Sequence, residues 1–277
     1  TVVEMHTANA FESDVSAYPA VTIIRRTQQG SAVVARADGN AESSGATVLA
    51  HALANARTRH QNGSMPTGLV ATCVDTWFEG ASPWPCTSPE RLHILRYLEH
   101  QFPSLEETGV RVGIGVATGC DEVFITTDPD LVENERLLPL AMGADTISGV
   151  LKWSGHYLVD PWDEAGVIDL SGYPRLAAFY EANRDRLTRR NVAQRRPMHW
   201  FRTIDRVTHD LTRRPKLYFP DIKDRIHPVL DTGETYPHHN LYFVVSNTWD
   251  IEALGGLLLS DVGQFFVECY GVRMRGG

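Results

Sequence analysis

The stretch "RVGIGVATGCDEVFIT", residues 111–126, decides how the middle of the chain folds. Its glycines suggest a phosphate loop, but the third glycine of a dinucleotide fingerprint is replaced by threonine, and the lysine of a P-loop is absent. Val112, Ile114 and Val116 alternate with Gly113 and Gly115, a period of two that is typical of a strand. Since "VFIT" after the turn predicts another strand, we expect a hairpin. Its glycines would allow another backbone segment or a ligand to approach the strand closely.

The overall composition is that of an ordinary globular protein. The 277 residues are 43% hydrophobic and 22% charged, enough for one large domain or two smaller ones. The sequence shows no apolar run of about 18 residues that would span a membrane and no recognisable secretory leader. The four cysteines lack a C-x-x-C pair, which argues against a zinc site or a disulfide framework and favours a reducing, cytoplasmic setting.

Positive charge is concentrated in one part of an acidic chain. The net charge is −8, yet residues 175–226 contain 14 Lys+Arg against 6 Asp+Glu, and the remainder contains 12 against 28. Most of these cations are arginine, which forms bidentate bonds to phosphate, and Trp200 among them offers a ring on which a base can stack. The pattern fits a polyanion-binding face, and it equally fits a solvated helix with ordinary salt bridges.

Periodicity and turn residues predict a mixed α+β chain. The best-defined element is a helix over residues 88–102, with Ser88 as its N-cap and Pro89 at the first helical position. The other expected elements, in chain order, are two strands before residue 27, a short strand at 32–35, a helix at 46–60, a short helix or turn at 135–147, a strand and turn at 156–170, a helix at 173–190, strands at 214–222 and 240–247, and one helix at 249–270.

Local polar patterns favour structural roles. Asp160 and Asp163 in "DPWD" are placed to cap backbone amides at a turn. His238 and His239 would point to opposite faces of a strand and therefore could not share a metal ion. Neither G-x-S-x-G nor H-E-x-x-H occurs, so we predict neither catalytic nor metal-binding residues in this chain.

Several segments follow one another in a distinctive order. They are "IGVATGCDEVFIT", "YLVDPWD", "YPRLAAFYEANRDRLTRR", "RPKLYFPDI", "NLYFVV" and "LGGLLLSDVGQFFVECYGVRMRGG". Their linked order resembles the C-terminal part of adenine-N6 DNA methyltransferases of restriction-modification or phage-defence type. From about residue 109 to 277, the resemblance is to the TaqI-like target-recognition domain. The opening "VVEMHTANAFESDVSAYPAVTIIRR" is similar to the closing strands of the preceding catalytic domain.

The resemblance implies an enzyme of which this chain is one part. The family's catalytic domain binds S-adenosylmethionine in a Rossmann-like sheet and uses an Asn-Pro-Pro-Tyr/Phe motif, and the chain contains neither that motif nor a glycine-rich cofactor loop. We therefore expect a fragment that is inactive by itself, whose catalytic domain and cofactor belong to an upstream part of the parent. The expected divisions are a catalytic-domain edge at 1–36, a helical connection at 37–108 and a recognition domain, incomplete at its C-terminus, at 109–277.

Double-stranded DNA is the partner that the resemblance implies, in the bacterial cytoplasm and at the nucleoid. The family's "TG" turn faces the DNA, and phosphate contacts by cations position such a domain. A standalone DNA-binding specificity subunit, a fused restriction-modification enzyme and a non-enzymatic protein-interaction domain remain alternatives. The predicted DNA-binding residues are Thr118, Gly119, Arg189, Arg190, Arg195, Arg196, Trp200, Arg213, Arg214, Lys216, Lys223, Arg225, Arg273 and Arg275.

Overall fold

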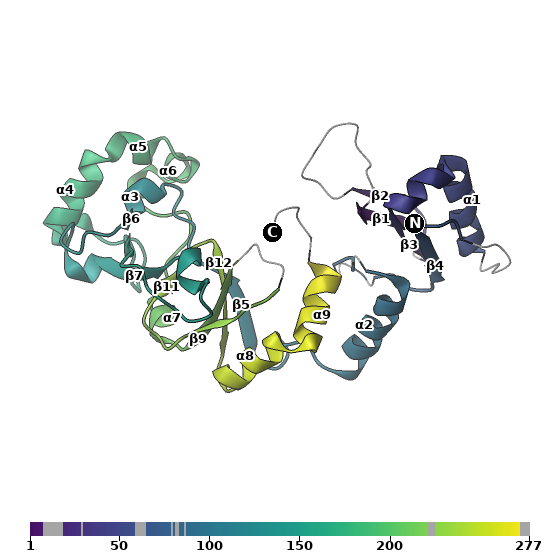
Figure 1. Ribbon diagram of the computed structural model, residues 1–277. Coiled ribbons are helices and arrows are strands. Elements are labelled where there is room, and N and C mark those ends of the chain that lie inside the picture. The colour runs from purple at the N-terminus through teal and green to yellow at the C-terminus, as the bar shows by residue number, and fades with distance from the viewer. Residues whose placement is uncertain are drawn as a thin grey trace. The chain divides into compact units, whose positions relative to one another are not determined.

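The computed structural model describes residues 1–7, 19–28, 30–58, 65–78, 80, 83–85, 87–220 and 225–271. The chain forms two compact units, one made of Thr1–Pro103 with Asp261–Gly277 and the other of Ser104–Ser260 (Figure 1). Within the described residues the strands form three four-stranded sheets, so the fold is mixed α+β as expected. Among these residues, no helix has the length and apolar character required to cross a bilayer.

The first unit is a sheet with helices on both faces. Its strands β1 (Val2–Thr7), β2 (Ala20–Thr22), β3 (Ala32–Asp38) and β4 (Leu69–Val74) lie in the order β2-β1-β3-β4, and only β1 and β3 are parallel. Neighbouring residues of β3 face opposite sides. Ala35 packs with Ala52 of α1 (Ala46–Arg57), whereas Val34 packs with Leu95 of α2 (Pro89–Gln101) and Cys269 of α9 (Asp261–Tyr270).

The N-terminal predictions are largely confirmed. Ser88 caps α2 by accepting a hydrogen bond from the Arg91 amide at 3.5 Å, and Pro89 begins the helix. The two early strands, the strand from Ala32 and the helix from Ala46 are present, and residues 59–60 of that predicted helix lie outside the described part. Strand β4 was not predicted.

The second unit contains two sheets. One is antiparallel, in the order β10 (Val229–Asp231), β9 (Lys216–Pro220), β12 (Leu241–Ser246) and β5 (Val110–Ile114). The other runs β11 (Tyr236–Pro237), β7 (Leu137–Ala141), β8 (Tyr157–Val159) and β6 (Ile125–Thr126). The remaining elements are η2 (Asn134–Arg136), η3 (Gly143–Thr146), η4 (Leu170–Gly172), α3 (Asp121–Phe124), α4 (Pro174–Ala182), α5 (Arg184–Thr188), α6 (Asn191–Arg195), η5 (Pro197–His199), α7 (His209–Arg213) and α8 (Ile251–Leu259).

The predicted hairpin at residues 111–126 is wrong, although the reason given for its glycines is confirmed. Strands β5 and β6 belong to different sheets, and between them the chain turns into the short helix α3. The Thr118 hydroxyl organises this turn, because it accepts from the Cys120 amide at 3.0 Å and donates to the Asp121 carboxylate. A methyl group on Gly115 would overlap the carbonyl oxygens of Pro237 and His238, so glycine is what allows this second segment to approach.

Two long predicted helices are interrupted. Residues 173–190 form α4 and α5, separated at Asn183, whose side-chain amide donates to the Phe179 carbonyl at 2.9 Å. Residues 249–270 form α8 and α9, separated at Ser260, whose backbone is extended. The segment 135–147, expected as a helix or turn, contains strand β7, which pairs with β8 and buries Leu140 and Ala141 completely.

Candidate nucleic-acid interface

Three predicted cations are exposed around one short helix of the second unit. Arg189 precedes α6, Arg195 is its last residue and Arg196 follows it; all three are exposed. Pro197 ends the helix by starting η5, and Met198 beside it is 85% exposed. We call Arg189, Arg195 and Arg196 the α6 arginines. A short helix that presents guanidinium groups to solvent has the chemistry required to contact phosphate.

Arg190, next to this group, has a structural role. Its guanidinium donates to four backbone carbonyls: those of Leu187 at 3.0 Å, Thr118 at 3.0 Å, Trp200 at 2.8 Å and Arg202 at 2.9 Å. Burial lowers the pKa of this side chain. Because its donors are committed to the fold, we leave Arg190 out of the proposed DNA surface.

The "TG" turn lies against the Arg190 guanidinium. The Thr118 side chain is completely buried, and its carbonyl accepts both from Arg190 and, at 3.3 Å, from the Ile204 amide. Gly119 adopts a left-handed φ of 77°, where a side chain would also meet Ile204 at 2.9 Å. The turn therefore has a demonstrable packing role, and a DNA contact by Gly119 remains a prediction.

Trp200 is half-buried among the arginines. Its ring packs edge-on against Phe201, with centroids 5.7 Å apart, and the Arg184 guanidinium lies 4.7 Å from its centroid. Arg184 also pairs with Glu181 at 2.8 Å. Arg184 thus covers one face of the indole, so a stacked base would have to use the other face or displace it.

A second group of predicted cations lies at α7 and β9. Figure 1 shows α7 beside β11 and β9 and away from α5 and α6, so the basic segment of the sequence supplies two separate groups. Arg213 and Arg225 are exposed. Arg214 bonds to the Asn247 side chain and pairs with Asp210 at 3.7 Å. Lys223, Arg273 and Arg275 fall outside the described residues.

Lys216 is buried inside the fold. Its side chain has no exposed area, and its ammonium group lies 3.1 Å from Asp231 on the neighbouring strand and donates to the carbonyls of Thr212 and Arg214. Burial lowers the pKa of Lys216, partly offset by the Asp231 charge. Burial alone would raise the pKa of Asp231, but hydrogen bonds from Thr235 and Glu234, together with Lys216, outweigh it and lower that pKa. We therefore leave Lys216 out of the DNA surface as well.

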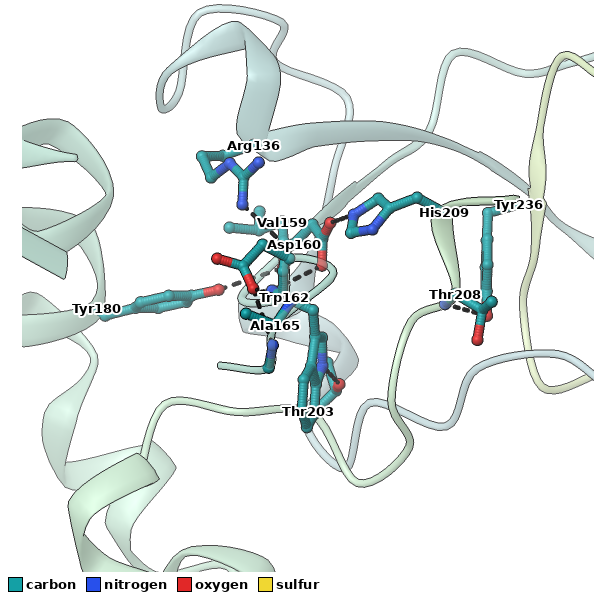
Figure 2. A network of polar contacts seen from close by, with 12 residues as sticks. Arg136, Val159, Asp160, Trp162, Ala165, Tyr180, Thr203, Thr208, His209 and Tyr236 are labelled. Atoms are coloured by element: carbon teal, nitrogen blue, oxygen red, sulfur yellow. Dashed lines mark hydrogen bonds and ion pairs between the residues drawn. The ribbon is translucent and has the colours of Figure 1, made fainter. Parts of the chain in front are cut away.

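The "DPWD" turn is the centre of a polar network (Figure 2). As predicted, the Asp160 carboxylate accepts from the Trp162 amide at 3.0 Å, and Asp163 accepts from the amides of Ala165 and Gly166. The second partner of Asp160, which no local sequence pattern indicates, is the imidazole of His209, whose Nε2 lies 2.5 Å from the carboxylate. This pair links the end of β8 to α7, a structural role within unit 2.

Figure 2 also shows how neighbouring side chains fix this turn. The Trp162 indole donates to the Thr203 hydroxyl at 2.8 Å, and the Arg136 guanidinium donates to the Trp162 carbonyl at 2.9 Å. The Tyr180 hydroxyl donates to the Val159 carbonyl at 3.2 Å. These three bonds connect the turn and the end of β8 to η2, to Thr203 and to α4.

The Asp160–His209 pair predicts a pH-dependent stability. The hydrogen bond between the two side chains raises the pKa of His209 in the folded protein. The stabilisation is therefore fully present below the pKa of the imidazole in the unfolded chain, and it disappears as the pH rises through the pKa of the folded state. We expect His209→Gln to destabilise the protein more at about pH 6 than at about pH 9. Urea unfolding at both pH values measures this, and His199→Gln, which removes an exposed imidazole, is the control. An equal loss at both pH values would contradict the assignment.

The prediction that His238 and His239 point to opposite faces of a strand is wrong. Strand β11 ends at Pro237, and the chain turns at His239, so the alternation of a regular strand does not apply. The two ring centroids are 4.0 Å apart.

In comparisons with known proteins, the chain is similar to three type II methyltransferases. The chain is 43% identical over 277 residues to the type II methyltransferase M.PaeR7I of Pseudomonas aeruginosa, 40% to M.XhoI of Xanthomonas vasicola and 38% to M.BstVI of Geobacillus stearothermophilus, each over 99% of the chain. No protein-family model matches. The solved type IIG restriction endonuclease BpuSI aligns with 90% of this chain and 31% of its own, at 11% identity and a TM-score of 0.26, which carries no argument.

The relatives are longer than this chain. It corresponds to 47% of M.PaeR7I, 50% of M.XhoI and 49% of M.BstVI. The chain thus spans about half the length of the curated relatives it matches, and over nearly all of its own length it is homologous to type II methyltransferases.

Proposed function

We propose that this chain is the DNA target-recognition part of a site-specific adenine-N6 DNA methyltransferase that uses S-adenosylmethionine. The observation that carries the proposal is the identity of 38–43% to three type II methyltransferases along almost the whole chain. The proposed DNA surface consists of the α6 arginines, with Gly119, Trp200, Arg213, Arg214 and Arg225 as further candidates. A bacterial cytoplasmic, nucleoid-associated location and a role in restriction-modification or phage defence accompany the proposal.

The α6 arginines support this role by their exposure. They lie within eight residues of one another in sequence and carry positive charge on a chain whose net charge is −8. A duplex offers a dense row of phosphates, and neutralising them releases counterions, which is the main sequence-independent source of DNA affinity. Phosphate contacts at α6 would position the unit so that other side chains can reach the bases.

The glycine-rich stretch around Gly115 does not fit the cofactor of such an enzyme. This stretch is packed against Pro237 and His238 rather than opened toward a ligand, and no Asn-Pro-Pro-Tyr/Phe motif occurs in the sequence. We therefore derive no methyl-transfer step from it. In our proposal the catalytic motif and the S-adenosylmethionine site belong to an upstream domain of the parent polypeptide.

Binding of a fluorescent duplex, followed by anisotropy at several salt concentrations, tests the proposal. We expect the affinity to fall at least about tenfold between roughly 50 and 200 mM salt. The double variant Arg195→Gln, Arg196→Gln should bind more weakly and reduce the slope of log K against log salt by about 2, near 1 for each lost phosphate contact. Lys152→Gln removes an exposed cation outside the basic segment and is the matched control.

Three results would contradict the proposal. The first is the absence of duplex binding at low salt by the correctly folded chain. The second is binding that does not change with salt. The third is an arginine double variant with the same salt slope as the control.

A further inference from the structure

Gly115 brings two distant segments into contact. The Val116 amide donates to the Pro237 carbonyl at 2.9 Å, and the His239 amide donates to the Val116 carbonyl at 3.1 Å. The His238 amide donates to Ala141 at 3.0 Å. These bonds fix the backbone of both histidines beside the start of α3, independently of any DNA contact.

Three metal-ligating side chains converge at this junction. Asp121, His238 and His239 each offer one ligand atom, and these atoms all lie within 4.8 Å of one another. The Nε2 atom of His238 is 3.2 Å from Oδ2 of Asp121. The other oxygen of Asp121 is held by the Thr118 hydroxyl, which orients the carboxylate with Oδ2 toward the histidine.

The imidazole of His238 is incompletely satisfied by the protein. Its side chain is only 5% exposed, and its Nδ1 atom has no hydrogen-bond partner among the described residues. Buried polar atoms are nearly always paired, and an exception calls for a water, an ion or a functional role. The unpaired atom shows that the described residues satisfy only one of the two nitrogens of this buried ring, the Nε2 that faces Asp121.

We propose that Asp121, His238 and His239 bind a divalent transition-metal ion, with zinc as the best match. Two imidazoles and a carboxylate are typical zinc ligands. Ligand atoms about 2.1 Å from a tetrahedral ion stand roughly 3.4 Å apart. A pair at the upper limit of 4.8 Å would therefore have to close by about 1.4 Å. The Asp121 carboxylate is held by Thr118, so the adjustment falls mainly to His239, whose side chain is exposed.

Metal binding would tie two elements together. A ligating imidazole is neutral and a ligating carboxylate is ionised, so protons compete with the ion for these side chains. The ion would join the end of β11 to the start of α3, which follows the Thr118–Gly119 turn in the chain. Its affinity should consequently fall as the pH is lowered.

Cobalt and zinc titrations of the untagged whole chain test this proposal. We expect Co²⁺ to produce visible ligand-field absorption that saturates at one equivalent, and Zn²⁺ to displace it and to raise the midpoint of thermal unfolding. Asp121→Asn and His239→Ala change side chains with solvent exposure, so both variants should fold, which circular dichroism checks. Each should weaken metal binding at least about tenfold. His93→Ala, which removes an exposed imidazole in the other unit, should bind as the unaltered chain does.

Two outcomes would overturn the site. The first is no saturable binding of Co²⁺ or Zn²⁺ by the unaltered chain. The second is equal binding by Asp121→Asn, His239→Ala and the His93→Ala control. Since neither measurement involves DNA, failure here leaves the recognition proposal untouched, and failure of duplex binding leaves the metal site untouched.

Discussion

Lys216→Met should lower the free energy of unfolding by about 3–5 kcal/mol, because it leaves the buried Asp231 carboxylate without its counter-ion. Methionine keeps the shape of the lysine stem but removes the ammonium group that pairs with Asp231 and donates to two carbonyls. Denaturant unfolding followed by tryptophan fluorescence measures the loss. Lys152→Met, at an exposed lysine, should change stability by less than about 0.5 kcal/mol.

A second substitution, at Asp231, distinguishes the contribution of the ion pair to stability from that of the other hydrogen bonds of Asp231. Asp231 also accepts from the amides of Gly233, Glu234 and Thr235, so Asp231→Asn alone should also be destabilising. If the ion pair is the dominant interaction, the double variant Lys216→Met, Asp231→Asn should lose clearly less unfolding free energy than the sum of the losses of the two single variants. Additive losses, or a Lys216→Met loss below about 1 kcal/mol, would show that the buried charges are not coupled in this way.

Arg190→Met should be the other strongly destabilising change, by roughly 3 kcal/mol, because four carbonyls lose a charged donor at once. These carbonyls belong to α5, the Thr118 turn and the loop at 200–202, so the substitution loosens the support of α6. Arg189→Met, one residue away and exposed, should be nearly neutral for stability. Thermal unfolding of the two variants makes the comparison, and equal midpoints would refute the structural role of Arg190.

The contrast between Arg189 and Arg190 shows that the sequence alone does not predict which arginine is exposed and which has a structural role. Both belong to the same basic run, and nothing local distinguishes a guanidinium that faces solvent from one that donates to carbonyls up to 72 positions away. The same holds for Lys216, whose partner Asp231 arrives only when β9 pairs with β10. The consecutive apolar residues Leu217, Tyr218 and Phe219 indicate a buried strand, but they do not show which way Lys216 points.

Local signals were dependable where the cause is local. The Ser88–Pro89 start of α2 and the amide caps of Asp160 and Asp163 depend on neighbours within a few residues, and they were predicted. The histidine pair was misjudged because β11 ends after Pro237, and a strand's end depends on its partners. The hairpin at 111–126 failed for a related reason: the glycines make room for a segment more than a hundred residues away, not for the next strand.

Selection of duplexes from a random-sequence library by the purified chain tests target recognition most directly. Phosphate contacts alone bind every duplex alike, whereas base contacts favour particular sequences by about 1–3 kcal/mol per base pair. We expect successive rounds to enrich one short recurring sequence, and the Arg195→Gln, Arg196→Gln variant to enrich the same sequence with weaker binding. A folded chain that binds the library without enriching any sequence, or does not bind it at all, would contradict target recognition by this chain.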